Sequence, residues 1–253
     1  MTGLLLRRGI LEKPHWTPQR EPGLVLWLSA ADEAVARGLA KADTAALDQW
    51  TDLSGQGNSP AQATGSKQPI LQHDGTRWCV VWDAIDDLLQ GAASPVAAGA
   101  ARTIIVAGKA GASANGIAPV VFRTAVAVYF AELAWIVSAF FVYSDGSIAN
   151  NNASISDQRT LIRSPFIASQ TSGGTGTKIA QRLNGNAFVV TQVGSVGADT
   201  GTDGLSIGAR PDAAFYPGGT YYGLLIYDRV LSSAEIQQAE RFMNRAHALG
   251  LGV

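Results

Sequence analysis

Short runs of apolar and polar residues, separated by turn-forming residues, make up most of the chain from residue 23 onward. The run WCVVWDA alternates with a period of two, which is typical of a strand: Trp78, Val80 and Trp82 share one side, and Cys79 and Val81 the other. The run LVLWLSA is apolar on both faces and predicts another strand. Further strands are predicted over residues 103–108, 119–124, 125–131, 135–144, 159–169, 177–185, 187–194, 204–210 and 220–230.

Segments rich in glycine, serine and asparagine separate these predicted strands. Asn184-Gly185-Asn186 favours a hairpin, because Asn-Gly supplies the positive φ angles that a type I′ turn needs. Many short strands without helices between them predict an antiparallel sandwich of two sheets and not an α/β fold. The absence of a fixed-period repeat disfavours a propeller or a solenoid.

The end of the chain carries the signals of one helix, which we predict over residues 232–249. Ser232 is a favourable N-cap, and Glu235 three residues later completes a capping box. The predicted apolar stripe consists of Ile236, Ala239, Met243 and Ala246. Three basic residues suit the negative end of the helix dipole: Arg241, Arg245 and His247. Gly250 is the expected C-terminal stop.

The first 22 residues differ from the rest of the chain. Prolines at positions 14, 18 and 22 disfavour a continuous helix or a central strand there. We therefore predict an extended arm over residues 1–22, followed by a single domain over residues 23–253. A disordered start is the alternative, but apolar side chains are costly to leave in water, which favours docking on a neighbouring subunit. The candidate assembly residues of the arm are Leu5, Arg7, Arg8, Ile10 and Trp16.

Composition and charge exclude several classes of protein. Of the 253 residues, 47% are hydrophobic and 15% charged, so a disordered chain is not expected. The net charge of −1 provides no basic field for nucleic acid. A single cysteine, Cys79, excludes an intrachain disulfide, and the three histidines lack zinc-site spacing. Arg123 and Glu132 interrupt the most apolar region, and the N-terminus lacks the charge order of a signal peptide, so no membrane insertion is expected.

Acidic residues could mark a glycosidase or a metal site. A glycosidase needs two carboxylates about 5–5.5 Å or 6.5–9.5 Å apart, and the six glutamates do not form the strand pattern E-x-D-x-(x)-E of glucanases with a similar fold. The nearest acidic group consists of Asp83, Asp86 and Asp87. These residues either bond the backbone of a turn or bind calcium, which prefers carboxylate oxygens. We therefore predict no cofactor, with calcium as an open alternative.

Gly204 to Gly208 match the G-x-S-x-G motif of serine hydrolases, with His247 further downstream. A nucleophile elbow needs a strand, a tight turn and then a helix, whereas a segment broken by proline and glycine follows Gly208. We therefore expect a plain strand here, and we predict no catalytic residue and no enzyme. A glycoside or ester hydrolase remains a remote alternative.

Exposed aromatic side chains could stack on sugar rings. Trp27, Trp50, Trp78 and Trp82 lie within apolar runs and are expected in the core. The better candidates for glycan contact are Trp135, Tyr216, Tyr221 and Tyr222, for which ordinary packing at a sheet edge is the alternative.

Three motifs in order resemble a known family. They are Trp50 to Asn58 (WTDLSGQGN) after the opening LVLWLSAAD, Asp83 to Leu88 (DAIDDL), and the strand-to-helix segment Gly219 to Glu235. Together they resemble the laminin G-like, concanavalin A-like jelly-roll domains of tailed bacteriophages, over residues 23–250. This sequence has Ala84 where the family's D-G-x-D-D turn has glycine.

The resemblance implies an all-β, two-sheet antiparallel jelly roll with an extended N-terminal arm and one C-terminal α-helix. It also implies a non-enzymatic structural protein of the virion, assembled in the host cytoplasm, such as a head decoration, head spike or tail-surface subunit. Its expected partners are other virion proteins through the arm, further copies of itself, most simply as a trimer, and a host-surface polysaccharide. The alternative is a lectin-like module whose main role is adsorption to carbohydrate.

Overall fold

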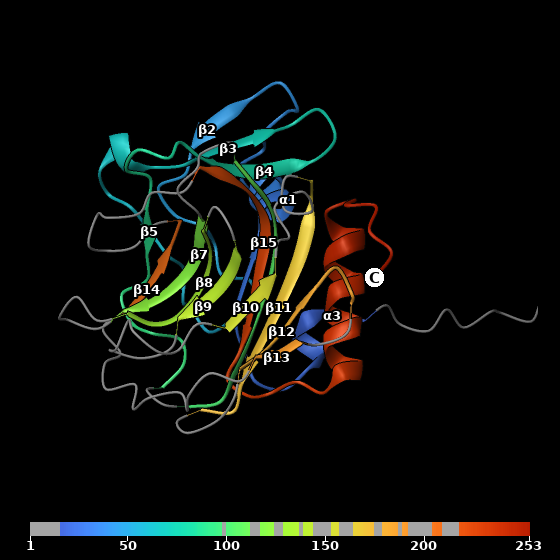
Figure 1. The fold of residues 1–253 in the computed structure, drawn as a ribbon. Coiled ribbons are helices and arrows are strands. Elements are labelled where there is room, and N and C mark those ends of the chain that lie inside the picture. The colour runs from blue at the N-terminus through green and yellow to red at the C-terminus, as the bar shows by residue number, and fades with distance from the viewer. Residues whose placement is uncertain are drawn as a thin grey trace, which may run out of the picture.

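Figure 1 shows the computed structural model of the chain, in which two antiparallel sheets face each other and one long helix covers the outside of the larger sheet. The structure describes residues 16–97, 100–111, 117–123, 129–136, 139–143, 153–156, 164–174, 179–186, 189–191, 204–208 and 218–253. Of residues 117–156, 179 and 189–191 it describes only the backbone. The predicted antiparallel β-sandwich is thus confirmed.

The larger sheet has nine strands in the order β13-β12-β11-β6-β15-β4-β3-β2, with β1 also paired to β15. Its strands are β1 (Leu24–Ser29), β2 (Thr44–Ala46), β3 (Ile70–His73), β4 (Trp78–Trp82), β6 (Arg102–Ala110), β11 (Phe166–Ser172), β12 (Ile179–Leu183), β13 (Val189–Thr191) and β15 (Gly219–Tyr227). The central strand β15 pairs along its whole length with β6, and its other side is shared between β4 and β1. All of these pairings are antiparallel.

The smaller sheet has six strands in the order β10-β9-β8-β7-β14-β5. They are β5 (Leu89–Gln90), β7 (Ile117–Arg123), β8 (Tyr129–Ile136), β9 (Ala139–Tyr143), β10 (Ala153–Ser156) and β14 (Gly204–Ile207). The sequence predicted one strand over 135–144, but the structure divides this stretch between the end of β8 and β9. Strands β2, β3, β5 and β10 were not predicted, because each has only two to four residues and carries little pattern.

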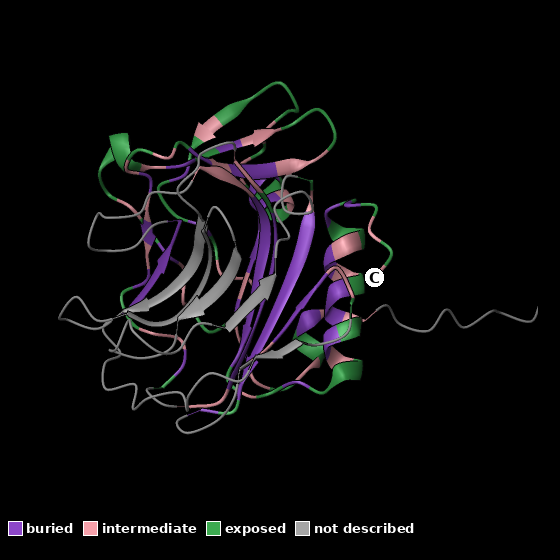
Figure 2. Ribbon diagram, in the orientation of Figure 1, coloured by how far each residue is buried: buried purple, intermediate pink, exposed green. Residues whose placement is uncertain are grey.

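Two apolar layers hold the fold together, one on each face of the larger sheet. Val80 and Trp82 of β4 belong to the layer between the sheets, whereas Cys79 belongs to the layer under the helix. The alternation predicted for this strand is therefore confirmed. Figure 2 shows buried residues along β11 and β15 and on the side of the helix that faces them.

The W-x-D-x-S-G-x-G-N segment closes the free edge of β1. Asp52 Oδ1 accepts hydrogen bonds from the backbone N–H groups of Trp27 and Ser54, at 3.0 and 2.9 Å. Leu53 N donates to the carbonyl of Trp27 at 2.8 Å, and the Asn58 amide donates to the carbonyl of Val25 at 2.8 Å. This loop thus takes the place of a neighbouring strand, which protects an edge that would otherwise expose unpaired backbone groups.

The C-terminal helix α3 (Ser233–Ala246) begins as predicted. Ser232 Oγ accepts from Glu235 N, and Glu235 Oε2 accepts from Ser232 N, which completes the capping box. The end of the helix differs from the prediction, because Ala248 adopts a left-handed conformation (φ 49°) before Gly250 is reached. Ala246, predicted on the apolar stripe, is exposed, whereas His247, expected at the helix end, is buried.

A second helix, α1 (Ala30–Ala36), follows β1 directly. Ser29 caps it by accepting a hydrogen bond from Asp32 N at 3.3 Å. The sequence did not predict this helix, since its seven residues form fewer than two full apolar turns. No helix among the described residues is long and apolar enough to cross a membrane.

The described part of the predicted arm begins at Trp16 and packs on its own domain. The Trp16 indole donates to Glu21 Oε1 at 2.7 Å and lies edge-on against Phe242 of α3. Glu21 and Glu235 in turn meet the guanidinium of Arg229. Residues 16–22, with a 3-10 helix over Pro18–Arg20, thus pack on the domain, and the half-buried Trp16, a predicted assembly residue, contacts Phe242 of its own chain. Leu5, Arg7, Arg8 and Ile10 lie outside the described residues.

Candidate functional site

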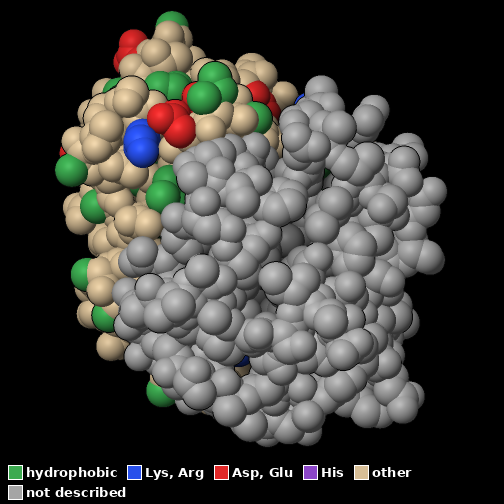
Figure 3. All heavy atoms as spheres, turned by 60° about the vertical axis from the view of Figure 1, so that its left-hand side comes forward, with side chains coloured by type: hydrophobic (Ala, Val, Ile, Leu, Met, Phe, Trp, Pro, Cys, Tyr) green, Lys and Arg blue, Asp and Glu red, His purple; other side chains and the backbone are tan. Residues whose placement is uncertain are grey.

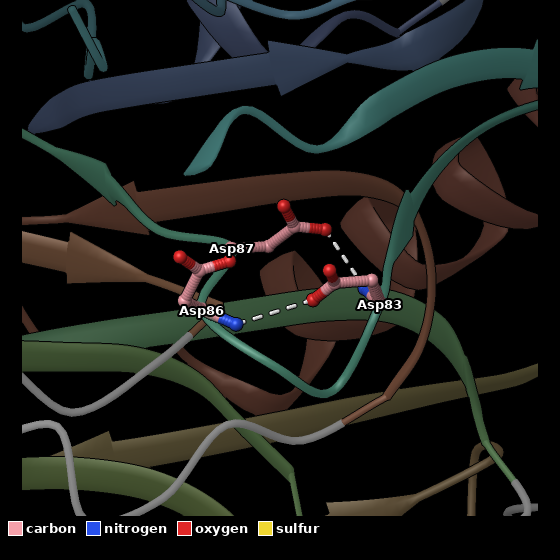
Figure 4. Close-up of side chains that lie close together, drawn as sticks. All are labelled: Asp83, Asp86 and Asp87. Carbon is pink, nitrogen blue, oxygen red and sulfur yellow. Dashed lines mark hydrogen bonds between the residues drawn. The ribbon is translucent and has the colours of Figure 1, made fainter. Parts of the chain in front are cut away.

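The acidic group predicted from sequence forms a compact turn between β4 and β5. Carboxylate oxygens of Asp83, Asp86 and Asp87 lie within 4.8 Å of one another, and no other group of three such acidic, histidine or cysteine ligands occurs among the described residues. Figure 4 shows the three side chains gathered on the inside of this turn. Three carboxylates at this spacing are a donor set that suits a calcium ion.

Backbone hydrogen bonds account for part of this arrangement. Asp83 Oδ1 accepts from Ile85 N at 2.7 Å and from Asp86 N at 3.3 Å, and Asp87 Oδ2 accepts from Asp83 N at 2.8 Å. The aspartates thus accept the backbone hydrogen bonds of the turn, which was the predicted alternative to calcium binding. Both roles are compatible, because a carboxylate oxygen can accept an N–H bond and still coordinate a cation.

Burial gives Asp87 an unusual protonation equilibrium. Its side chain is buried, and desolvation, together with the neighbouring charges of Asp83 and Asp86, raises its pKa to about 6. A cation in the turn would favour the ionised form and lower this pKa. Calcium and protons should therefore compete for Asp87.

The acidic turn lies at the surface with one apolar side chain exposed. Ile85 is 70% exposed between the aspartates, and Ala84 takes a left-handed conformation with φ 65°. The resembled family has glycine at this position. Alanine here is a strained substitution, because a left-handed conformation is unfavourable for a residue with a Cβ atom. Figure 3 shows the side of the molecule to which β5 and β14 belong, where acidic and hydrophobic side chains adjoin over its described upper part.

The predicted aromatic contacts are not brought together. Tyr221 and Tyr222 are 2% and 1% exposed, so the prediction that they offer a platform to a glycan is wrong. A bulge in β15 at Tyr222 places Tyr221 between the sheets and both Tyr222 and Gly223 on the helix side. Tyr216 lies outside the described residues, and of Trp135 only the backbone, in β8, is described.

The G-x-S-x-G segment is a plain strand, as expected. Ser206 lies in β14, where it pairs with Gln90 of β5 and Val121 of β7, and its side chain is buried. Gly208 follows in a left-handed conformation and packs against the ring of Trp82. No nucleophile elbow is therefore formed at this motif.

Sequence reasoning missed a cluster of unpaired polar groups beside Tyr222. The guanidinium carbon of Arg77 lies 5.4 Å from the centre of the Tyr222 ring. The centre of the His247 ring, at the C-terminal end of α3, lies 6.5 Å from the centre of the same Tyr222 ring. Arg77 Nε and Nη1 and both His247 ring nitrogens are buried without a hydrogen-bond partner in the described structure. Burial lowers the pKa of His247 to about 4, and the charge of Arg77 adds to this shift.

No family model matches the sequence. No curated protein is significantly similar to it. Among solved structures, the chain is similar to a Trypanosoma rangeli sialidase in complex with sialic acid, with a TM-score of 0.62 and 10% identity over 90% of this chain and 34% of that one. It is also similar to a botulinum neurotoxin serotype D ligand binding domain in complex with N-acetylneuraminic acid, with a TM-score of 0.57 and 11% identity over 87% and 51% of the two chains.

The receptor binding domain of the botulinum neurotoxin C/D mosaic serotype gives a TM-score of 0.54 at 11% identity. The chain spans about a third of the length of the sialidases and about half of the toxin domains that it matches. At these identities the likeness shows the fold, a β-sandwich, and nothing finer.

Proposed function

We propose that this chain is a non-enzymatic, carbohydrate-binding β-sandwich of a virion surface. The observation that carries the carbohydrate part is that two different groups of solved proteins, sialidases and toxin binding domains, share this sandwich and have been solved with sialic acid. The proposal for this chain rests on that shared architecture together with its acidic turn, which offers a site for calcium.

The absence of catalysis is part of the proposal. The sialidases are enzymes, but the chain corresponds to only 34% of their length. In the described part of this chain, Ser206 is enclosed in a strand, and the acidic turn is bonded to its own backbone. Binding without turnover is therefore the function that these residues favour.

The virion assignment rests on the motifs that resemble phage jelly-roll domains, and on the apolar and basic composition of the first residues. Trp16 packs on Phe242 of α3 and Glu21 pairs with Arg229 before the helix, so residues 1–15 would attach the subunit to other virion proteins or to further copies of itself. Deletion of residues 1–15 should leave a folded domain that no longer joins its parent particle. Normal incorporation of this deletion variant would contradict the role of the arm.

A glycan array tests the carbohydrate part. The purified chain should bind a defined subset of bacterial and sialylated glycans, and it should release no free sugar from them. Since affinity for each sugar is expected to be weak, the chain should be presented in multivalent form. Release of sialic acid would contradict the non-enzymatic assignment, and silence from a folded sample would contradict carbohydrate binding.

A further inference from the structure

Arg77 differs from the other buried or partly buried arginines whose side-chain partners are described. Arg37, Arg182 and Arg229 each form an ion pair with a glutamate. Arg77 is partly exposed, yet its Nε and Nη1 are buried without a hydrogen-bond partner, and it takes part in none of the ion pairs within the described residues. Buried cationic donors without an anion are costly, and the described residues supply no anion for Arg77 Nε and Nη1.

The position of Arg77 is fixed by the ring below it. The bulge in β15 turns Tyr222 toward the helix side of the larger sheet, and the guanidinium lies over this ring. Gly223 follows Tyr222 and leaves room for His247, since a Cβ at this glycine would come within 2.6 Å of His247 Nε2. The cation–π contact orients Arg77 but satisfies none of its N–H groups.

The surroundings favour an anion. Lys109, exposed at the end of β6, faces the same side of the sheet as Tyr222, and both Lys109 and Arg77 lie close enough to Cys79 to act on its pKa. Asp74 is the acidic residue nearby, but its Oδ1 accepts the backbone N–H groups of Thr76 and Arg77 and is held within its own turn. The guanidinium therefore has no carboxylate partner among the described residues, and an external carboxylate would reach it through the partly exposed side of Arg77.

We propose that Arg77, oriented by Tyr222 and supported by Lys109, binds the carboxylate of an acidic sugar. A planar guanidinium can hold a carboxylate through two parallel hydrogen bonds, which a lysine cannot reproduce. The ligand would be recognised here through its charge and not by stacking, because Tyr222 is covered. This subsite deepens the proposed function and rests on it.

Titration with N-acetylneuraminic acid and with its methyl ester tests the subsite, since the ester keeps the sugar and removes the charge. The side-chain Nε–H resonance of Arg77 should shift with the acid and not with the ester. Arg77→Met should weaken binding of the acid about tenfold or more, and Arg77→Lys should restore only part of it. Lys41→Met, which removes an exposed cation elsewhere, is the matched control and should bind as the wild type does.

Unchanged binding by a folded Arg77→Met variant would overturn the subsite, as would equal binding of acid and ester. An array that is positive only for neutral glycans, with no Arg77 shift, would overturn the subsite and leave carbohydrate binding intact. A silent array without an Arg77 shift on addition of the acid would overturn both the subsite and carbohydrate binding. Glucuronic acid serves as a second acidic probe, and a response to both acids would support recognition of the carboxylate itself.

Discussion

The guanidinium of Arg182 and the carboxylate of Glu240 meet 2.8 Å apart between β12 and α3, with 7% and 0% of their side chains exposed. Ser169 Oγ donates to the other oxygen of Glu240 at 2.7 Å. Burial raises the pKa of Glu240, which Ser169 and Arg182 counteract. The ion pair therefore links α3 to the larger sheet, and the ionised form of Glu240 depends on its contacts with Arg182 and Ser169.

Removing one member of this pair should be costly. Arg182→Met leaves the Glu240 carboxylate buried without its cation, so we expect a loss of about 3–5 kcal/mol in the free energy of unfolding. The double variant Arg182→Met with Glu240→Leu should lose less than the single one. Urea denaturation measures both, with the exposed Arg245→Met of the same helix as a control, and a double variant less stable than Arg182→Met would contradict this account.

His247 should make the fold sensitive to acid. Its pKa in the folded chain is about 4, below the ordinary value of 6.5, so the unfolded chain takes up a proton first as the pH falls. Stability should therefore decrease from about pH 6.5 down to pH 4, by about 3 kcal/mol in total from this residue. His247→Leu should flatten the dependence over this range. Parallel curves for variant and wild type in urea unfolding would show that His247 is not responsible.

Asp52 should be a structural residue and not a ligand-binding one. Asp52→Ala removes the acceptor for Trp27, Ser54 and Asn58, and we expect a loss of about 2–4 kcal/mol of stability. Ser54→Ala keeps the backbone N–H and removes only the hydroxyl that donates to Asp52 Oδ2, so it should cost about 1 kcal/mol. Thermal unfolding checks both, and glycan binding by the remaining folded protein should be unchanged.

Ala84→Gly should stabilise the acidic turn. A left-handed conformation costs an alanine roughly 1–2 kcal/mol, which exceeds the extra chain entropy that glycine loses on folding. We expect a gain of about 0.5–1 kcal/mol, whereas Ala234→Gly in helix α3 should lose a similar amount. A lower midpoint for Ala84→Gly in chemical denaturation would contradict the strain argument.

Calcium binding to the acidic turn should depend on pH. Isothermal titration at pH 7.5 should detect one site, and Asp86→Asn should weaken it. Below pH 6 the affinity should fall, because Asp87, whose pKa is about 6, takes up a proton. Asp32→Asn, an exposed site on α1, should have no effect. Equal heats for Asp86→Asn and wild type would remove this turn from the candidate metal sites.

Much of the fold follows from local patterns in the sequence. The alternation of β4, the capping box of α3 and the turn at Asn184 and Gly185, with φ angles of 49° and 75°, are all found where they were predicted. These signals act over a few residues, so that no knowledge of the tertiary structure is needed to read them.

The site was less predictable because its geometry depends on irregular backbone. Tyr221 and Tyr222 lie on opposite faces in any strand, but only the bulge of β15 places Tyr222 and Gly223 on the same side, and no sequence signal marks the bulge. The unpaired state of Arg77 depends on which carboxylates the fold brings near it, which a sequence does not show. A short helix such as α1 is decided by packing more than by pattern.

Saturation-transfer NMR on the intact chain tests carbohydrate binding most directly, because it detects weak complexes in solution. Sialyllactose and host-surface polysaccharides are the probes, and lactose is the control without an acidic sugar. The account predicts saturation transfer to the protons of an acidic glycan. An excess of a competing acidic sugar should abolish this transfer. No transfer to any glycan from a folded sample, with and without calcium, would contradict it.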